Sequence, residues 1–285
     1  MKVAYPLATA VLWLAAPAVS QTAEQRTIWN RPTEPFRVAE NLYYVGTEAL
    51  GAFLIATPKG HVLIDGAMPE SADQIAANIR RLGYRVEDVK YLLISHAHMD
   101  HAGGLARLKA LSGSRLLASA GDAPELAAGK VAYRESFDFP PVEVDRVIAD
   151  GERLRIGGTT LTAHVTPGHT KGCTSWSARI EHERRPLDVI FACSLTVAGQ
   201  PLVDDAGYPE AAADFRASFE KLKRLKADVY VTFHSGFFAM EAKRKRQAAG
   251  EPNAFIDPAE LSRRIAAAQQ AFEKEYARQQ AGGEP

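Results

Sequence analysis

Four apolar runs in this chain each end at a polar side chain of the kind that binds metals or small anions. YLLIS precedes His96, LTAHVTPGH ends at His169, VIFAC precedes Ser194, and VYVTF precedes His234. Short aliphatic and β-branched runs of this kind predict buried strands. In α/β folds the loops at strand ends converge on a site, and packing alone explains four such endings poorly. The pattern therefore predicts one site assembled from distant segments.

Strand and helix patterns alternate along both halves of the chain, with short β-type runs followed by longer amphipathic ones. Strands are expected at residues 40–46, 51–57, 60–66, 89–95, 114–120, 145–150, 152–158, 159–166, 173–180, 187–193 and 227–233. Helices are expected at residues 71–83, 103–113, 209–226 and 257–280. No linker separates the halves, so the pattern predicts one α/β domain with two sheets between helical layers.

Local signals define some of these boundaries. The turn Pro58-Lys59-Gly60 between the second and third strands predicts a hairpin. Ser71 and Gln74 form a capping-box pattern at the start of the first helix. Asp257 is the expected N-cap of the last helix, with Pro258 in its first turn.

Residues 1–20 have the features of a secretory signal peptide. Lys2 supplies a positive charge, an apolar run follows, and small residues end at Ser20. The apolar run is shorter than the roughly 20 residues that span a membrane, and no Cys stands at the cleavage point to carry a lipid. We therefore predict cleavage near Ser20, a single mature domain over residues 21–285, no membrane anchor, and a periplasmic or secreted location.

Composition and charge argue against some kinds of partner. Of the 285 residues 46% are apolar and 24% charged, and the formal net charge is zero. Such a chain is an ordinary soluble protein, long enough for a sizeable core. A zero balance favours neither nucleic acid nor an anionic membrane. We therefore expect no nucleic-acid partner; we also expect a small-molecule substrate and a monomer.

Three imidazoles and a carboxylate fall within six positions after one predicted strand. His96 and His98 are two apart, so in an extended chain their side chains point the same way and can bind one metal. The chain must then turn, because a Gly-Gly pair opens the next helix. That turn can direct Asp100 and His101 at a second metal.

Two distant histidines complete the ligand sets. His169, in TPGHTKG, would give the first metal a third nitrogen, and His234 would join Asp100 and His101 on the second. Three protein ligands with an open position is the catalytic zinc arrangement, and nitrogen and carboxylate donors favour zinc over iron or manganese. The sequence thus predicts two Zn²⁺ per chain, with a shared hydroxide as nucleophile. The other histidines, interpreted as surface or hydrogen-bonded residues, are His61, His164 and His182.

These residues carry a resemblance to a known family. HAHMDHAGG resembles the H-x-H-x-D-H signature of the metallo-β-lactamase superfamily, and PGHTKG resembles its second metal motif. Similarity extends over nearly all of the mature chain, from WNRPTEPFRVAENLYYVGTEALGAFLI through LIDGAMPES to TFHSGFF. The resemblance implies an αββα sandwich, in which two mixed β-sheets are flanked by helices, and an enzyme that opens β-lactam antibiotics.

The residue at position 194 indicates which subclass of the family the chain resembles. Enzymes of the first subclass have Cys there and glyoxalase-like relatives a metal-bridging Asp, whereas this chain has Ser194. Ser with an Asp-His-His second metal set resembles the third subclass, which hydrolyses penicillins, cephalosporins and carbapenems with two zinc ions. The resemblance implies that Ser194 and Thr196 hold the substrate carboxylate through their hydroxyls. It also implies that Asp65 orients metal ligands; the alternative is a plain turn-forming Asp before Gly66.

The two cysteines, Cys173 and Cys193, both fall in the predicted exported part. An even count in an oxidising compartment predicts a disulfide, with free buried thiols as the alternative. Cys193 also lies beside the predicted site, and a thiolate is an excellent zinc ligand. Some relatives of the third subclass carry a cysteine pair at comparable places. The resemblance therefore favours the bridge, which would brace the loop of His169 against that of Ser194.

Together these observations predict a secreted di-zinc β-lactamase of the third subclass. The zinc on His96, His98 and His169 would polarise the lactam carbonyl, a bridging hydroxide oriented by Asp100 would attack it, and the second zinc would stabilise the departing nitrogen. One alternative is another hydrolase on the same fold, a thioesterase or lactonase. Others are a di-iron redox enzyme with a flavin partner and a non-enzymatic zinc-binding protein. The preferred lactam depends on loops such as residues 121–140 and is not predicted.

Overall fold

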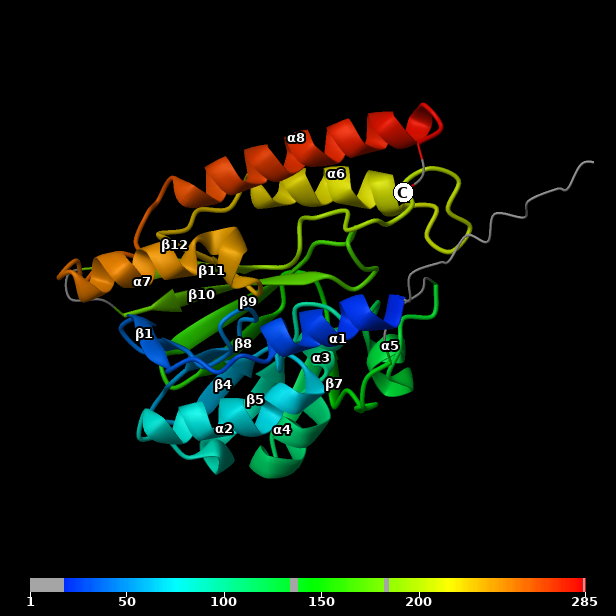
Figure 1. Ribbon diagram of the computed structural model, residues 1–285. Coiled ribbons are helices and arrows are strands. Elements are labelled where there is room, and N and C mark those ends of the chain that lie inside the picture. The colour runs from blue at the N-terminus through cyan, green and yellow to red at the C-terminus, as the bar shows by residue number, and fades with distance from the viewer. Residues whose placement is uncertain (1–17, 134–137, 182–184, 284) are drawn as a thin grey trace, which may run out of the picture.

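Two β-sheets pack face to face between outer layers of helices (Figure 1). The computed structural model describes residues 18–133, 138–181, 185–283 and 285, with side chains described from residue 24 onward. In spatial order, the seven-stranded sheet consists of β1 (Phe36–Ala39), β2 (Leu42–Tyr44), β3 (Phe53–Ile55), β4 (His61–Ile64), β5 (Val89–Leu93), β6 (Arg115–Ser119) and β7 (Arg146–Ile148). The five-stranded sheet consists of β12 (Val229–Thr232), β11 (Leu187–Ala192), β10 (Thr174–Ile180), β9 (Thr159–Val165) and β8 (Arg153–Ile156).

Both sheets mix parallel and antiparallel pairs. In the larger sheet β1 to β4 pair antiparallel and β4 to β7 pair parallel. In the smaller sheet β8 to β11 pair antiparallel and β11 pairs parallel with β12. The predicted hairpin is confirmed, because β3 and β4 pair antiparallel with Phe53 opposite Ile64. The predicted fold class, two mixed sheets flanked by helices in an αββα sandwich, is also confirmed.

Helices cover the outer face of each sheet (Figure 1). The seven-stranded sheet carries α2 (Ala72–Arg81) and α4 (Leu105–Ser112), and the five-stranded sheet carries α6 (Ala211–Leu222) and α8 (Glu260–Gln280). The remaining helices, with η for 3₁₀ helices, are α1 (Ala18–Trp29), η1 (Pro69–Ser71), η2 (Val86–Asp88), α3 (Met99–Ala102), α5 (Ala123–Ala128), η3 (Ser235–Phe238) and α7 (Met240–Ala248).

The central strands are buried on both faces, which explains why they read as continuous apolar runs. On β5, Leu92 packs into the core beneath α2 and α4, and its neighbour Leu93 packs into the core between the sheets. Leu116 and Leu117 on β6 divide in the same way. Because successive side chains alternate across a strand, one short run anchors both cores. The loops that leave these strands therefore start from fixed positions.

Two predicted helix caps are wrong. Ser71 has helical backbone angles and makes no capping bond; its Oγ instead lies 2.5 Å from the side chain of Asn30, the residue that follows α1. Gln74 Nε2 has no hydrogen-bond partner among the described residues. The last helix begins at Glu260, so Asp257 lies before it and accepts a hydrogen bond from the Ala259 backbone nitrogen. At Ser71 a tertiary contact outweighs the local signal, whereas Asp257 makes a local turn before the helix begins.

Several short elements lack a predictive pattern, among them β1, α1, α3, α5 and α7. Helix α1 spans the point near Ser20 where cleavage is predicted, while residues 1–17 of the predicted signal peptide lie outside the described residues. Signal-peptide cleavage therefore stays a prediction. In the described part of the chain, no helix has the length and apolarity needed to cross a membrane.

Candidate active site

The six predicted metal ligands come from three loops and converge at one edge of the sandwich. The loop after β5 supplies four of them, and the loops after β9 and β12 supply one each. In the first group, the rings of His96, His98 and His169 lie with their centroids 4.7–4.8 Å apart. One ligand nitrogen from each of the three lies within 4.8 Å of the other two. Three imidazoles so placed can hold one metal ion.

The second group lies directly beside the first. The Asp100 Oδ2 atom is 3.3 Å from His101 Nε2 and 3.2 Å from His234 Nε2. The ring centroids of His96 and His101 are 4.0 Å apart, so the two groups are adjacent. The structure therefore brings all six predicted ligands together, in the two sets of three that the spacing indicated.

Close backbone packing fixes the turn that separates the two groups. His98 is extended, and the next residue starts the one-turn helix α3 that carries Asp100 and His101. At Gly104, a Cβ atom would lie 2.2 Å from the carbonyl oxygen of Gly66, so no other residue fits without displacing one of these loops. The Gly-Gly pair thus presses this turn against the loop after β4, which carries Asp65.

Asp65 lies behind the second group and is fully buried. Its Oδ2 is 2.9 Å from His101 Nδ1, so the opposite nitrogen of His101 points toward Asp100. Ser95 donates to the Asp65 carboxylate from both its backbone nitrogen (2.6 Å) and its hydroxyl (2.7 Å). The same hydroxyl lies 3.0 Å from His96 Nδ1. Asp65 therefore makes the contacts expected of a carboxylate that orients metal ligands.

The charge states of the ligands suit a divalent cation. Burial, reinforced by the neighbouring histidines, holds the pKa of His96 well below its usual value, and its buried Nε2 has no hydrogen-bond partner among the described residues. Burial would raise the pKa of Asp100, but His101 and His234 outweigh it and hold that pKa well below normal. A neutral imidazole and an ionised carboxylate are the forms that bind metal, so these donors fit zinc.

A metal bound by the second group would have to displace a proton from His101. Burial alone would lower its pKa, but the carboxylates of Asp100 and Asp65 reverse that effect and raise the pKa to about 10. Without a metal this imidazole therefore carries a proton at neutral pH. A cation bound by the second group takes over that positive charge, and binding releases the proton.

The predicted substrate-binding hydroxyls line a pocket beside the second group. This pocket, of about 180 Å³, is bordered by His101 and His234 on one side and by Ser194 and Thr196 on another. The two hydroxyl oxygens are 3.0 Å apart. The Thr196 carbonyl oxygen accepts from His169 Nδ1 at 2.8 Å, which links the hydroxyl loop to the first ligand group.

The pocket also contains residues that carried no signal in the sequence. Arg264 of α8 and the 49%-exposed Phe237 line it. Phe237 and Trp29 contact the His234 ring, with centroids 5.5 and 6.0 Å away. An arginine on an amphipathic helix is indistinguishable in sequence from a solvated surface charge, and only the packing of α8 places it here.

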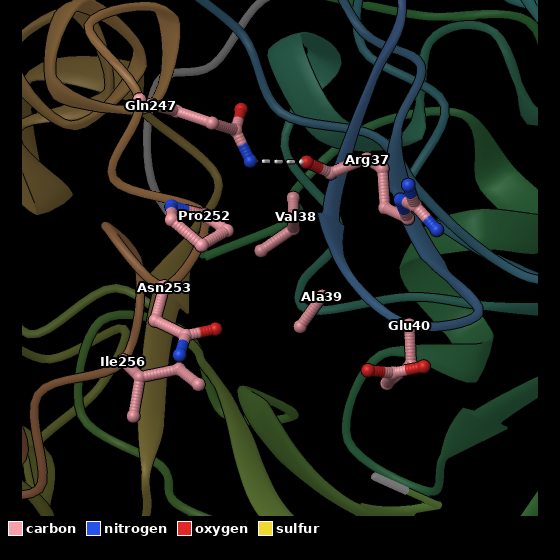
Figure 2. Close-up of a pocket in the computed structure, with 9 residues that line it drawn as sticks. Arg37, Val38, Ala39, Glu40, Gln247, Pro252, Asn253 and Ile256 are labelled. Carbon is pink, nitrogen blue, oxygen red and sulfur yellow. Dashed lines mark hydrogen bonds between the residues drawn. The ribbon is translucent and has the colours of Figure 1, made fainter. Parts of the chain in front are cut away.

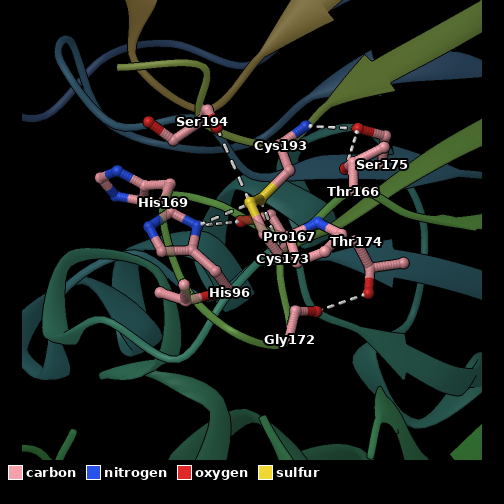
Figure 3. Close-up of a disulfide and its surroundings, with 12 residues drawn as sticks. His96, Thr166, Pro167, His169, Gly172, Cys173, Thr174, Ser175, Cys193 and Ser194 are labelled. Atoms are coloured by element: carbon pink, nitrogen blue, oxygen red, sulfur yellow. Dashed lines mark hydrogen bonds between the residues drawn. A yellow bond between two sulfur atoms is a disulfide. The ribbon is translucent and has the colours of Figure 1, made fainter. Parts of the chain in front are cut away.

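Cys173 and Cys193 form the predicted disulfide (Figure 3). Both residues are buried, and their Cα atoms lie 5.9 Å apart. The bridge joins the segment that follows His169 to the residue that precedes Ser194. Oxidation to the disulfide removes the thiolate of Cys193 as a zinc ligand.

The other histidines occupy structural positions. His61 Nδ1 accepts from the Thr57 backbone nitrogen at 3.3 Å, and His164 Nε2 lies 2.8 Å from the Ser177 hydroxyl. His182 lies outside the described residues. A separate cavity of about 730 Å³, between β1 and the segment after α7, contains none of the predicted site residues; there Gln247 donates to the Arg37 carbonyl at 3.1 Å (Figure 2).

Comparison with known proteins agrees with this geometry. Residues 52–234 match the family described as Metallo-beta-lactamase superfamily, a match that spans more than half of the chain. The chain therefore belongs to this superfamily of hydrolases, whose name implies a bound metal, typically zinc.

Similar solved structures include several metallo-β-lactamases. A metallo-β-lactamase of Cronobacter sakazakii is 43% identical with a TM-score of 0.86, and the match covers 89% of this chain and 98% of that chain. BJP-1, described as a subclass B3 metallo-β-lactamase of Bradyrhizobium japonicum, is 41% identical with a TM-score of 0.85, covering 90% and 98%. Among curated relatives, an N-acyl homoserine lactonase of Bacillus cereus is 27% identical, over 68% of this chain and 82% of the relative.

Proposed function

We propose that this protein is an exported di-zinc β-lactamase that hydrolyses the ring amide of penicillins, cephalosporins and carbapenems. The observation that carries the proposal is the pair of adjacent three-residue ligand groups with a hydroxyl-lined pocket beside them. The similarity to subclass B3 enzymes over about 90% of the chain supports the choice of substrate.

Each ligand group has a defined part in this proposal. His96, His98 and His169 hold one zinc ion, and Asp100, His101 and His234 hold the other. When bound, the two ions supply Lewis acidity and lower the pKa of water to about 7, which provides a nucleophile at neutral pH. Asp100 also accepts a hydrogen bond from the attacking water and orients it toward the lactam carbonyl.

The pocket positions the substrate for that attack. β-Lactams carry a carboxylate next to the ring nitrogen, and the Ser194 and Thr196 hydroxyls donate hydrogen bonds to it. Arg264 also lines the pocket; its guanidinium pairs with Glu260 at 3.0 Å, and its positive charge favours an anion in the same place. Binding the carboxylate here would bring the ring amide close to the second ligand group, because His101 and His234 line the same pocket.

Asp65 acts through His101. Its carboxylate holds the Nδ1 proton of His101, which keeps the opposite nitrogen aimed at the metal and makes it a better donor. Asp65 is thus a positioning residue, since it is buried behind the ligands and does not reach the pocket.

A lactonase is the second candidate, because the Bacillus cereus relative is an N-acyl homoserine lactonase. The same metal chemistry opens a lactone ring, so the ligand groups do not separate the two activities. Position 194 counts against the lactonase without being decisive, because glyoxalase-like relatives have a metal-bridging Asp at this place and this chain has Ser194. Without that carboxylate, we favour the lactam.

Export is part of the proposal. The signal-peptide pattern of residues 1–20 motivates it, and the disulfide agrees with an oxidising compartment. Growth of a strain that expresses the full chain, followed by fractionation and N-terminal sequencing, tests it. We expect mature protein outside the cytoplasm, starting near Gln21; full-length protein in the cytoplasm would contradict export.

The decisive test of the activity is a substrate panel on the purified mature protein. Protein freed of metal by a chelator and protein reloaded with zinc are compared on a penicillin, a cephalosporin, a carbapenem, an acyl homoserine lactone and a thioester. We expect two zinc ions per chain, turnover of the lactams and no turnover in the metal-free control. Turnover of the lactone or thioester without any lactam would overturn the proposal.

A further inference from the structure

The disulfide lies directly behind a predicted zinc ligand. Cys193 Sγ is 3.7 Å from His96 Nδ1 and 3.2 Å from the Ser95 carbonyl oxygen (Figure 3). One ligand-type atom each from His96, Cys173 and Cys193 lies within 4.8 Å of the other two, and the two sulfurs are bonded to each other in the disulfide. The fold therefore places three potential metal-ligand sets side by side. In one of them the two sulfurs are bonded to each other as a disulfide and cannot bind a metal as thiolates.

The set of His96, Cys173 and Cys193 would be a strong zinc site if the disulfide were reduced. Thiolates are softer donors than carboxylates and are preferred by zinc, and a Cys₂His set with one open position is a known zinc arrangement. All three residues are buried, with relative exposures of 1% or less. Burial keeps water from competing for a metal held there.

His96 cannot serve two sets at once. A neutral imidazole offers one nitrogen lone pair, because the other nitrogen carries a proton. In the oxidised protein Ser95 Oγ and the disulfide lie at Nδ1, and Nε2 has no hydrogen-bond partner within the described part of the chain. A metal bound by the two thiolates at Nδ1 would leave the proton on Nε2 and deprive the first group of one of its three ligands.

We propose that reduction of Cys173–Cys193 opens a Cys₂His metal site that captures His96 from the first ligand group. The disulfide thereby keeps two thiolates out of the catalytic ligand set and fixes which site the metal enters. This inference rests on the assignment of His96 to the first group in the proposed function. Before oxidation, the chain binds zinc in a different place from the mature enzyme.

The chemistry balances with a trialkylphosphine as reductant. The phosphine gives two electrons to the S–S bond and leaves as its oxide, with oxygen taken from one water molecule. The two protons of that water convert the sulfurs to thiols. Binding of a divalent metal then releases both thiol protons, and reoxidation of the metal-free dithiol by a small disulfide restores the bridge.

Cobalt(II) substitution tests the proposal without measuring activity. The mature chain is unfolded, reduced and refolded with phosphine present, because the bridge is buried, and thiol titration confirms two free thiols. Metal-free oxidised and reduced proteins are then titrated with Co²⁺. We expect the near-ultraviolet charge-transfer absorption of a thiolate–cobalt bond only in the reduced protein, with two metal ions bound per chain in both forms.

Two variants serve as controls. The double variant Cys173→Ser, Cys193→Ser carries hydroxyls at the same places and is expected to show no thiolate absorption under either condition. In reduced His96→Ala the absorption should shift, because the third ligand is gone. Near-ultraviolet circular dichroism checks that each refolded protein is native; if the double Ser variant fails this check, Cys173→Ala, Cys193→Ala replaces it, and if His96→Ala fails it, His96→Gln does.

Three results would overturn the proposal, and none depends on the substrate. The first is a natively folded reduced protein without thiolate absorption. The second is absorption unchanged by His96→Ala, which would mean that the thiolates bind metal without this histidine. The third is a count of three metal ions in the reduced protein, which would mean that the sites do not compete. Absence of lactam turnover, by contrast, bears only on the proposed function.

Discussion

The two ligand groups lie side by side, yet the fold holds them in different ways. The first is entirely imidazole, and uncharged groups support it: a serine hydroxyl behind His96 and a backbone carbonyl behind His169. The second includes the carboxylate of Asp100 and is supported by another buried carboxylate, Asp65. The first group thus depends on the placement of neutral donors, whereas the second attracts a cation by charge as well.

The groups also differ in access to solvent. His96 and His169 are buried, whereas the His234 side chain is 29% exposed at the pocket and is held by aromatic contacts. The carboxylates of Asp100 and Asp65 attract a cation by charge, so the second group can bind metal even though the His234 side chain is partly exposed to solvent. This contrast predicts that substitutions will affect the two groups unequally.

The largest expected effect comes from removing one ligand of each group. His98→Ala should reduce zinc from two ions per chain to one and nearly abolish lactam turnover, because only two neutral donors remain in the first group. His234→Ala leaves Asp100 and His101 with Asp65 behind them, so the second zinc should bind weakly rather than be lost. Zinc content after dialysis and kcat/KM measure the difference.

His164→Ala is the matched control, since that imidazole contacts Ser177 away from both groups and should keep both ions. Full activity and two zinc ions in His98→Ala would refute the ligand assignment. Equal loss of zinc in His98→Ala and His234→Ala would refute the contrast between the groups.

A smaller effect is expected from neutralising the carboxylate behind the second group. Asp65→Asn keeps an oxygen that can accept from His101 but removes the charge, so zinc affinity of the second group should fall roughly 10- to 100-fold. The first group should keep its affinity. Competition with a chromophoric chelator resolves the two binding steps, and thermal unfolding checks that the variant is folded. Equal weakening of both steps would show that Asp65 supports the site as a whole.

The ligands also differ in how far the sequence alone could predict their positions. Strand alternation puts His96 and His98 on one side, and the Gly-Gly pair requires the turn that redirects Asp100 and His101. These are local consequences of backbone geometry, so they were readable from one sequence. The convergence of His169 and His234 depends on strand order, which the sequence pattern alone does not determine; their assignment to the two ligand sets rested only on their positions after predicted strands.

Other features could not be predicted from the sequence because they depend on how helices and strands pack against one another. The capping box at Ser71 failed because α1 brings Asn30 to that hydroxyl, and α1 itself had no predictive pattern. Arg264 is separated from His234 by thirty positions and belongs to a helix with many surface charges. Whether such a residue faces solvent or the pocket follows from the rotation of α8 on the sheet, which no local signal encodes.

Arg264 gives the next smaller prediction, on substrate binding rather than metal binding. Arg264→Gln should raise KM for anionic lactams about fivefold with little change in kcat, since loss of one partly solvated charge near a carboxylate costs about 1 kcal/mol. Zinc content should stay at two. Arg263→Gln is the matched control, because the adjacent side chain pairs with Asp257 and does not line the pocket. An unchanged KM in Arg264→Gln, or an equal rise in both variants, would exclude Arg264 from substrate binding.

The smallest effect on activity is expected from a residue that supports the first group, where the change appears in the dependence of stability on pH. Asp122 is buried; its Oδ1 accepts from the Thr170 hydroxyl at 3.2 Å, next to His169, and its Oδ2 has no partner among the described residues. Burial raises the pKa of Asp122 to about 7, the Thr170 bond opposes the rise, and the Glu125 charge adds to it.

A raised pKa means that the folded protein keeps a proton that the unfolded chain releases above about pH 4. The contribution of Asp122 to the free energy of unfolding is therefore fully present below pH 4 and is lost as pH rises through about 7. Asp122→Asn cannot ionise, so its stability should fall less than that of the unaltered protein over this range. Urea unfolding at several pH values measures both curves, with the exposed Asp73→Asn as control. If the unaltered protein and Asp122→Asn gave parallel curves, Asp122 would be ionised in the folded protein. A charged carboxylate, and not a neutral carboxyl group, would then support the loop of His169.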